Sequence, residues 1–156
     1  MSTLQRLTTI LTQRQLTIAT AESCTGGNIS SLLTSQSGSS VYFDRGFVTY
    51  SNQSKVEMLG VSKDVLNEFG AVSEQTAEQM AKGVIMQAKT DISIAVTGIA
   101  GPSGGSTLKP VGMVCFGFCI LGSHFTSTQQ FTGDRSQVID TSVNFVLTTL
   151  INELSS

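Results

Sequence analysis

The chain has 156 residues, a formal net charge of −2, and 40% hydrophobic and 13% charged residues, which is typical of a folded globular domain and excludes a disordered chain. The nine lysines and arginines form no cluster, so the sequence lacks the basic surface of a nucleic-acid-binding protein. It also contains no apolar run long enough to span a membrane. We therefore expect one domain, covering residues 1–156, that binds neither nucleic acid nor membrane.

The cysteine and histidine content limits the chemistry further. Three cysteines form an odd set without metal-type spacing, and the N-terminus lacks the plan of a signal peptide, so we expect reduced thiols in a cytoplasmic protein. The single histidine, His124, excludes a histidine-rich metal site. A Ser-His-Asp triad would need it, and nothing near it in the sequence supports one. We expect no metal and no cofactor.

Hydrophobic periodicity predicts alternating helices and strands along the chain. A helix is predicted over residues 3–14, where apolar residues recur at helical spacing. The other predicted elements are a strand at 16–21, a helix from about Gly26 to Gln36, a strand at 46–50, short helices capped by Ser51 and Ser62, a long helix after Ser73, strands at 91–97, 111–121 and 125–131, and a final helix opening at Gly133-Asp134. This alternation predicts an α/β fold, a three-layer α/β/α sandwich, and the hairpin after residue 111 makes its mostly parallel sheet mixed.

Hydroxyl side chains stand where three predicted strands end, at Ser23, Tyr50 and Thr97. If these strands are parallel neighbours, the three hydroxyls converge on the sheet edge where α/β proteins bind ligands. Ser23 is a candidate nucleophile in a turn whose Gly26 and Gly27 allow close approach to the backbone and open a helix with unpaired N–H groups. The alternative is a tight turn with a Ser/Thr helix cap.

Lys55 is the candidate base, because it follows Tyr50 in the first turns of the Ser51-capped helix and can bend back over the same edge. A lysine acts as a base only when burial or positive potential lowers its pKa; otherwise Lys55 is an ordinary surface lysine. Tyr50 is a candidate proton relay. Cys24 is the alternative nucleophile, but without an imidazole to form a thiolate we favour a buried thiol.

The glycine-rich loop from Gly98 to Ser106 is a candidate phosphate cradle through backbone N–H groups, notably near Gly98 and Gly101. It matches neither the P-loop pattern nor the dinucleotide-binding pattern. Arg135, near the start of the final helix, is a candidate partner for an anionic group. Either feature alone is also compatible with an ordinary surface loop and a surface charge.

Taken together, several short stretches resemble the CinA C-terminal domain family, which includes stand-alone nicotinamide-nucleotide amidases. In chain order they are Thr20-Ala21-Glu22-Ser23-Cys24-Thr25-Gly26-Gly27, Val48-Thr49-Tyr50-Ser51-Asn52 with Lys55, Gly70-Ala71-Val72-Ser73, Val96-Thr97-Gly98-Ile99-Ala100-Gly101-Pro102, Lys109-Pro110-Val111-Gly112 and Gly133-Asp134-Arg135. The resemblance covers nearly the whole chain and implies a three-layer α/β/α fold and a homodimer. It also implies metal-independent hydrolysis of a pyridine nucleotide, nicotinamide mononucleotide, to nicotinate mononucleotide and ammonia.

The resemblance also implies roles for individual residues. Ser23 matches the family's nucleophile, Lys55 its general base, Tyr50 the assisting hydroxyl and Thr97 a residue lining the pocket, and Arg135 is placed to meet the substrate's phosphate. Two positions depart from the family pattern: Ile139 stands where an arginine is expected, and Leu108 where members tend to carry a polar or acidic residue. The alternatives are therefore a catalytically inactive relative that binds a nucleotide and a protein-interaction module.

Overall fold

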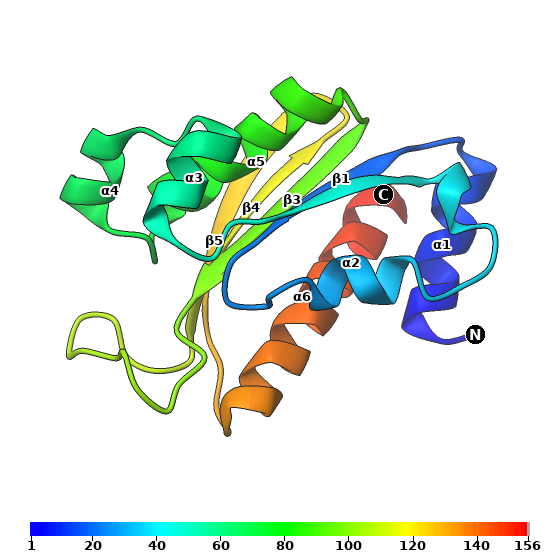
Figure 1. Cartoon of the computed structure of the whole chain (residues 1–156). Helices are drawn as coiled ribbons and strands as arrows, with labels where there is room; N and C mark the ends of the chain where they lie inside the picture. The colour runs from blue at the N-terminus through cyan, green and yellow to red at the C-terminus, as the bar shows by residue number, and fades with distance from the viewer. Residues whose placement is uncertain (156) are drawn as a thin grey trace.

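The computed structural model describes residues 1–155, which form a five-stranded sheet covered by helices (Figure 1). The elements are α1 (Thr3–Gln13), β1 (Ile18–Glu22), α2 (Asn28–Leu33), a 3-10 turn (Ser39–Val41), β2 (Phe43–Val48), α3 (Asn52–Leu59), α4 (Lys63–Phe69), α5 (Glu74–Ala88), β3 (Ile92–Gly98), β4 (Met113–Ile120), β5 (Ser123–Gln130) and α6 (Arg135–Ser155). The predicted alternation of helices and strands is confirmed.

The strand order is β2-β1-β3-β4-β5. β1 pairs in parallel with both β2 and β3, whereas β4 runs antiparallel to β3 and to β5. The mixed sheet is therefore as predicted. Because the three parallel strands are neighbours, their carboxyl ends meet at one edge of the sheet.

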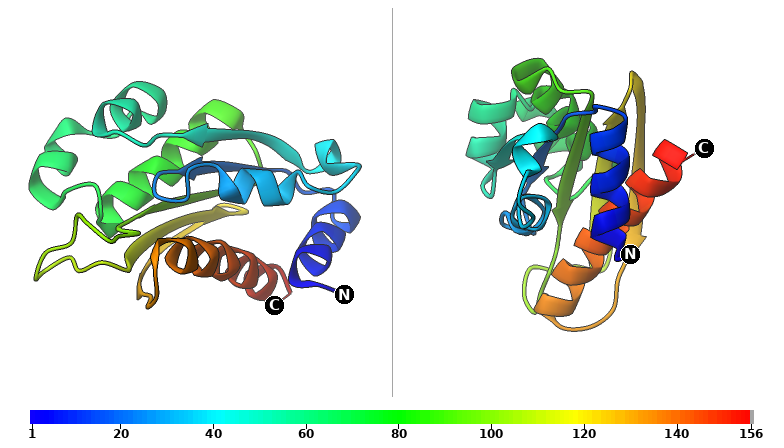
Figure 2. Two further views of the ribbon diagram at one scale, coloured as in Figure 1. Left: turned by 60° about the horizontal axis from the view of Figure 1, so that its bottom comes forward. Right: turned by 90° about the vertical axis from the view of Figure 1, so that its right-hand side faces the viewer.

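Helices cover both faces of the sheet, which gives the three predicted layers. In the left view of Figure 2, α3, α4 and α5 lie above the sheet, and α1 and α6 lie below it. One apolar core joins the sheet to α1, α2 and α6, and a smaller one joins it to α3, α4 and α5. The smaller core supports α3, the helix that carries Lys55.

Two predicted boundaries are wrong by several residues. The second strand covers Phe43–Val48 rather than 46–50, because Phe43 already pairs with Ile18 of β1. The helix predicted to run to Gln36 ends at Leu33. The hydroxyls of Thr34 and Ser35 donate to carbonyls of the last turn (Thr34 Oγ1 to Ser30 O, 2.8 Å; Ser35 Oγ to Leu32 O, 2.6 Å), and such bonds compete with helix continuation.

Gly83 lets α5 approach the end of α3 closely, and we expect its replacement by alanine to destabilise the fold. A Cβ atom at this position would lie 2.1 Å from the carbonyl oxygen of Leu59. Overpacking of this kind costs about 1 to 3 kcal/mol. Chemical denaturation of Gly83→Ala should show this loss, whereas Gln87→Ala, at an exposed position of the same helix, should change the free energy of unfolding little. Equal stability of the two variants would contradict the close packing.

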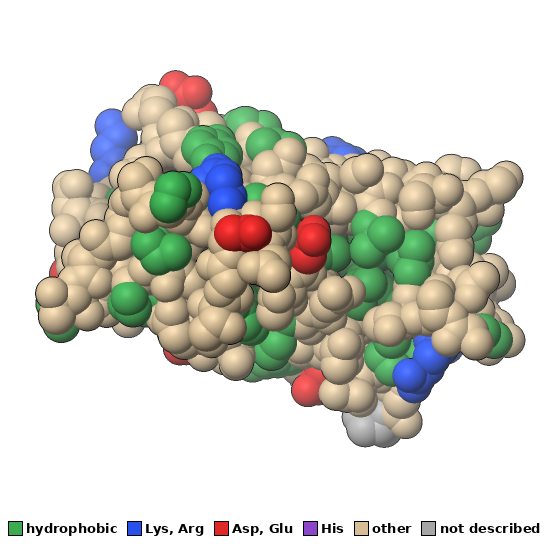
Figure 3. All heavy atoms as spheres, turned by 90° about the horizontal axis from the view of Figure 1, so that it is seen from below, with side chains coloured by type: hydrophobic (Ala, Val, Ile, Leu, Met, Phe, Trp, Pro, Cys, Tyr) green, Lys and Arg blue, Asp and Glu red, His purple; other side chains and the backbone are tan. Residues whose placement is uncertain are grey.

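Two observations concern binding to membranes and to nucleic acids. Residues 1–155 form no helix that is both long and apolar enough to cross a bilayer. On the face shown in Figure 3, basic side chains lie apart from one another rather than in one patch. This face therefore lacks the concentrated positive charge with which proteins bind a phosphate backbone.

Candidate active site

The turn between β1 and α2 holds Ser23 at the carboxyl edge of the sheet. Ser23 is 7% exposed, and its N–H donates to Val96 O of β3 at 3.0 Å, so the residue continues the β1–β3 pairing. The chain then turns back, with Gly26 N donating to Ser23 O at 3.1 Å. Positive φ angles at Gly26 and Gly27 make this turn possible, since other residues rarely adopt them. The hydroxyl of Ser23 is thus carried by a turn of fixed shape.

Lys55 reaches the same edge from α3. The helix is capped by Ser51, whose Oγ accepts from Ser54 N at 3.0 Å, and Lys55 lies in the first turn after this cap. Its side chain is only 1% exposed. Burial disfavours the charged form and lowers the pKa of Lys55 to about 8. The alternative of a solvated surface lysine is therefore wrong.

The Lys55 amine and the Ser23 hydroxyl form a buried pair. Lys55 Nζ lies 2.9 Å from Ser23 Oγ, 2.8 Å from Thr49 O and 3.4 Å from Tyr50 O. A neutral lysine amine has two N–H groups and one lone pair. When the two carbonyl oxygens accept the N–H groups, the lone pair faces Ser23 Oγ, which is the arrangement that a general base requires.

Tyr50 meets the Ser23–Lys55 pair through its backbone carbonyl and not, as predicted, through its hydroxyl. Its carbonyl oxygen faces the pair, 3.5 Å from Ser23 Oγ, while its side chain is 60% exposed. Arg135 Nη2 donates to the Tyr50 hydroxyl at 3.0 Å, and Arg135 Nη1 donates to Gly101 O at 2.7 Å. The phenol therefore lies with Arg135 rather than with the amine of Lys55.

A cavity of about 300 Å³ opens beside the pair. Its lining comes from the ends of the parallel strands, the start of α3, the segment before α5, the loop after β3 and the start of α6: Ser23, Cys24, Tyr50, Lys55, Ala71, Val72, Thr97, Gly98, Ile99, Ala100, Gly101, Ser103, Gly104 and Arg135. The predicted convergence of Ser23, Tyr50 and Thr97 is confirmed. Among these lining residues the charged ones are Lys55 and Arg135, both basic, so the cavity favours an anionic ligand.

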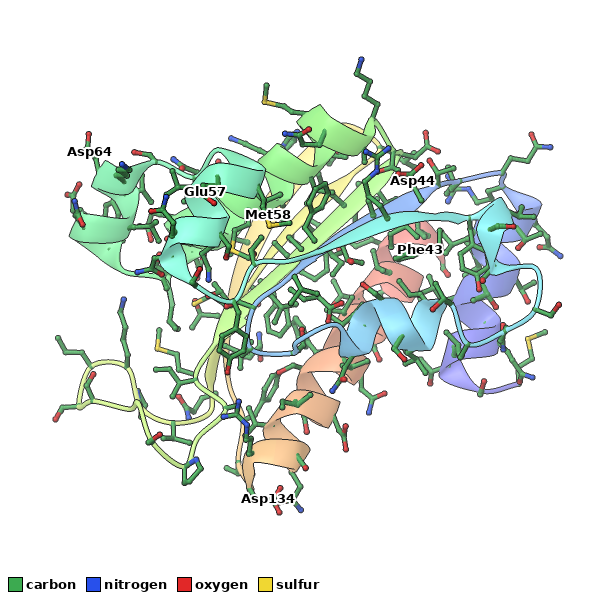
Figure 4. All side chains as sticks on the ribbon, viewed as in Figure 1. Phe43, Asp44, Glu57, Met58, Asp64 and Asp134 are labelled. Carbon is green, nitrogen blue, oxygen red and sulfur yellow. The ribbon has the colours of Figure 1, made fainter. Side chains whose placement is uncertain are left out.

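The segments that build this cavity meet at one end of the sheet. In Figure 1 the turn after β1, the loop after β3 and the start of α6 lie together there. Thr97 Oγ1 donates to Ala71 O at 2.9 Å, which ties β3 to the segment before α5. Asp134, labelled in Figure 4 at the beginning of α6, accepts from Gln137 N at 2.9 Å. This cap fixes the start of the helix that carries Arg135.

The four glycines predicted to bind substrate divide into two pairs. Gly98 and Gly101 line the cavity, but Gly26 and Gly27 do not. The expectation that the turn at Gly26 and Gly27 presents backbone N–H groups to a ligand needs correction. The N–H of Gly26 is used within the turn, and the N–H groups of Ile29 and Ser30, at the start of α2, donate to the carboxylate of Glu22 at 2.8 and 2.9 Å.

Cys24 and His124, the other residues considered for catalysis, do not contact one another in the structure. Cys24 is 7% exposed, and burial raises the pKa of its thiol to about 12, so the prediction of a buried thiol is confirmed. His124 lies in the β4–β5 hairpin, with Nδ1 3.3 Å from Cys119 Sγ. Within residues 1–155, no group of three or more His, Cys, Asp and Glu side chains is placed to hold a metal ion.

The two departures from the family pattern lie away from the cavity. Ile139 packs against the larger apolar core, and Leu108 is 90% exposed in the loop after β3. Neither side chain lines the cavity. The residues that sequence reasoning missed are Glu22 and the carbonyl of Thr49. The sequence shows Glu22 directly before Ser23 but not its burial, and a carbonyl acceptor such as that of Thr49 leaves no sequence signal.

Fold and site together define a class: a three-layer α/β/α protein with a buried serine–lysine pair that opens into a cavity at the carboxyl edge of a parallel set of strands. The model of the CinA C-terminal domain matches residues 2–154. The chain belongs to the CinA C-terminal domain family. Solved structures share the fold closely. A competence/damage-inducible protein from Agrobacterium tumefaciens is 43% identical with a TM-score of 0.94, covering 99% of this chain and 94% of that one.

Curated relatives fall into short and long proteins. A protein from Enterobacter agglomerans named nicotinamide-nucleotide amidohydrolase PncC is 52% identical over 137 residues, which cover 87% of this chain and 84% of that protein. A CinA-like protein from Chloroherpeton thalassium is 54% identical over 130 residues, covering 81% of this chain but 31% of that protein. The chain thus spans nearly all of the first relative and about a third of the second.

Proposed function

We propose that this protein is an amidohydrolase that converts nicotinamide mononucleotide to nicotinate mononucleotide and ammonia. The observation that carries the proposal is the buried pair of Ser23 Oγ and Lys55 Nζ, 2.9 Å apart at the wall of the cavity. Support comes from the similarity to the Enterobacter agglomerans protein, which bears the name of this activity. A serine hydroxyl with an adjacent base is the nucleophile and base arrangement that acyl transfer from an amide uses.

In the first step, neutral Lys55 takes the proton of Ser23 as Ser23 Oγ bonds to the carboxamide carbon. The carboxamide oxygen becomes an oxyanion. We place it against the backbone N–H of Cys24, because Cys24 directly follows the nucleophile and lines the cavity, as the residue after a strand-to-helix nucleophile does in other serine hydrolases. A well-placed donor at such an oxygen contributes about 3 kcal/mol to the transition state.

In the second step, protonated Lys55 gives its proton to the amide nitrogen and the carbon–nitrogen bond breaks. Ammonia leaves, and the acyl group stays on Ser23 as an ester. Lys55, neutral again, takes a proton from water as the water oxygen bonds to the ester carbon. The bond between this carbon and Ser23 Oγ then breaks, Lys55 returns the proton to Ser23 Oγ, and the nicotinate carboxyl group is released. The carbonyls of Thr49 and Tyr50 keep the amine aimed at Ser23 throughout, since both accept its N–H groups.

Arg135 is the proposed partner of the substrate phosphate. It lies at the cavity wall, and its guanidinium donates to Gly101 O and the Tyr50 hydroxyl. A phosphate accepts two parallel N–H groups from a guanidinium. Thr97, Gly98 and Gly101 form the remaining proposed contact surface around the nucleotide.

We expect Arg135→Ala to raise KM for nicotinamide mononucleotide by about 10- to 100-fold, because a hydrogen bond to a charged group contributes about 1.5 to 3 kcal/mol, while kcat changes less. Steady-state ammonia release measures both constants. Nicotinamide riboside, which has no phosphate, serves as the matched substrate: its kcat/KM should be nearly the same for wild type and variant. An equal loss on both substrates would show that Arg135 does not act on the phosphate.

The proposed function is tested by incubating the purified protein with nicotinamide mononucleotide and measuring ammonia and thermal stabilisation in parallel. Ammonia together with stabilisation supports the hydrolase. Stabilisation without ammonia would show a protein that binds the nucleotide and does not hydrolyse it. Since Ile139 packs in the core and does not line the cavity, the missing arginine at this position gives no specific support to that second reading.

We further propose that the protein acts in the cytoplasm as a homodimer. The three free, buried cysteines support a reducing compartment. The edge strand β2 supports self-association, because it leaves one side of its backbone unpaired and its Val48 is 46% exposed. Light scattering on the eluting protein gives the oligomeric state directly.

A further inference from the structure

A fully buried carboxylate stands directly before the nucleophile. Glu22 is the last residue of β1 and is 0% exposed. One oxygen accepts from Thr25 Oγ1 at 2.7 Å and from Ile29 N at 2.8 Å, and the other accepts from Ser30 N at 2.9 Å and Ser30 Oγ at 2.7 Å. All four donors belong to the turn after Ser23 or to the first turns of α2. The side chain therefore ties both ends of the turn to the strand.

This arrangement fixes the shape of the segment that carries Ser23. The turn spans residues 23–27, and the Glu22 carboxylate holds residues on both sides of its two left-handed glycines, which alone would leave the backbone mobile. The backbone of Glu22 also contacts Thr49, the residue whose carbonyl binds the amine of Lys55. Its carbonyl accepts from Thr49 N at 2.9 Å, and the carbonyl of Thr49 accepts from Lys55 Nζ.

The Glu22 carboxylate also determines which N–H groups and charges remain available to a ligand. The N–H groups at the start of α2 would attract an anion, but Glu22 already accepts the N–H groups of Ile29 and Ser30. The positive charge that remains toward the cavity when Lys55 is neutral is that of Arg135. An anionic substrate group is thereby directed away from the α2 terminus and toward the start of α6.

We propose that Glu22 is the positioning residue of this site: its buried carboxylate holds the turn so that Ser23 Oγ stays within reach of Lys55. Glu22 does not line the cavity and does not touch the reacting atoms, so it acts through the turn. The proposal rests on the proposed function for its kinetic readout, and a second readout, the reactivity of Ser23 itself, is independent of the substrate.

The test is Glu22→Gln, which keeps the shape of the side chain. The amide retains one acceptor oxygen, but its NH₂ group cannot accept the N–H of Ile29 or Ser30. We expect kcat for ammonia release to fall by about 10- to 100-fold, because small misplacements of reacting groups have effects of this size, with KM within about twofold of wild type. Labelling of Ser23 by a fluorophosphonate probe should slow by a similar factor.

Glu74→Gln is the matched control. Glu74 is also a carboxylate that accepts two side-chain hydrogen bonds, from Thr126 and Thr128, each at 2.5 Å, but it lies outside the cavity. This variant should keep the kcat and the labelling rate of wild type. If Glu22→Gln does not fold, Thr25→Val removes one of the four donors and leaves the carboxylate in place, and it should show a smaller loss of kcat and of labelling rate.

The outcomes are distinct. A folded Glu22→Gln protein with wild-type kcat and wild-type labelling overturns the positioning role, as does a loss that appears in KM alone. If wild type releases no ammonia but Ser23 is labelled quickly, and Glu22→Gln slows that labelling, the proposed substrate is wrong and the positioning role stands. A wild-type Ser23 that the probe does not label overturns both.

Discussion

Ser23→Ala should reduce ammonia release from nicotinamide mononucleotide by at least about 10³-fold. Without the Oγ atom no ester can form, and the amine of Lys55 loses the group that lies 2.9 Å from it. Removal of the nucleophile in comparable hydrolases has effects of 10³-fold and more, because nucleophile and base act as a unit. The measurement is initial ammonia release at saturating substrate, at protein concentrations high enough to detect the residual rate.

Ser142→Ala is the control for this experiment. Ser142 is fully buried in α6, and its hydroxyl donates to Val138 O of the same helix at 2.7 Å; it shares this helix with Arg135 but does not line the cavity. This variant should keep ammonia release within about twofold of wild type. Thermal stabilisation by the nucleotide should survive in Ser23→Ala, because Arg135, the proposed partner of the phosphate, is intact. A Ser23→Ala protein with more than a tenth of wild-type activity would contradict the nucleophile assignment.

Lys55→Met should abolish activity and remove the rise in stability with pH that the buried amine gives to wild type. Burial lowers the pKa of Lys55 to about 8 in the folded protein, against 10.5 in the unfolded chain. Between these values the folded state has released the proton and the unfolded state still holds it. Unfolding then takes up a proton, so the free energy of unfolding of wild type rises with pH in this window.

The expected size follows from the two pKa values. Relative to Lys55→Met, wild type should gain up to about 3 kcal/mol in its free energy of unfolding between pH 8 and 10.5, since one pKa unit corresponds to about 1.4 kcal/mol. Urea unfolding at a series of pH values measures the difference. Lys63→Met removes an exposed lysine at the start of α4 and should show no comparable trend. A flat difference for Lys55→Met would contradict the buried amine.

The same pKa sets the pH dependence of activity. The proposed base is the neutral amine of Lys55, so kcat/KM of wild type should rise as the pH increases through about 8 and level off above it.

The sequence predicted the sheet and the residues of the site better than it predicted the contacts among those residues. Parallel order could be inferred because strands and helices alternate, and this placed Ser23, Tyr50 and Thr97 at one edge. The burial of Lys55 could not be inferred, because it depends on α3 packing against α5 through Gly83, a contact between segments distant in the chain. Motif resemblance, rather than periodicity, carried the assignment of Lys55.

The orientation of individual side chains and backbone groups in the site was the least predictable feature of the structure. Tyr50 was placed correctly at the cavity, but whether its hydroxyl or its carbonyl meets Lys55 depends on backbone geometry after β2. The role of Gly26 and Gly27 was inferred from the general affinity of helix starts for anions. In the structure neither glycine lines the cavity, and the N–H groups at the start of α2, those of Ile29 and Ser30, donate to the carboxylate of Glu22.

The most direct test of the Ser23–Lys55 amidohydrolase is a stoichiometry measurement. Wild-type protein is incubated with nicotinamide mononucleotide, and ammonia and nicotinate mononucleotide are quantified in the same samples, with Ser23→Ala in parallel. We expect equal amounts of the two products from wild type and neither from Ser23→Ala above background. Folded wild type that forms neither product, or Ser23→Ala that forms both at the wild-type rate, would contradict the assignment.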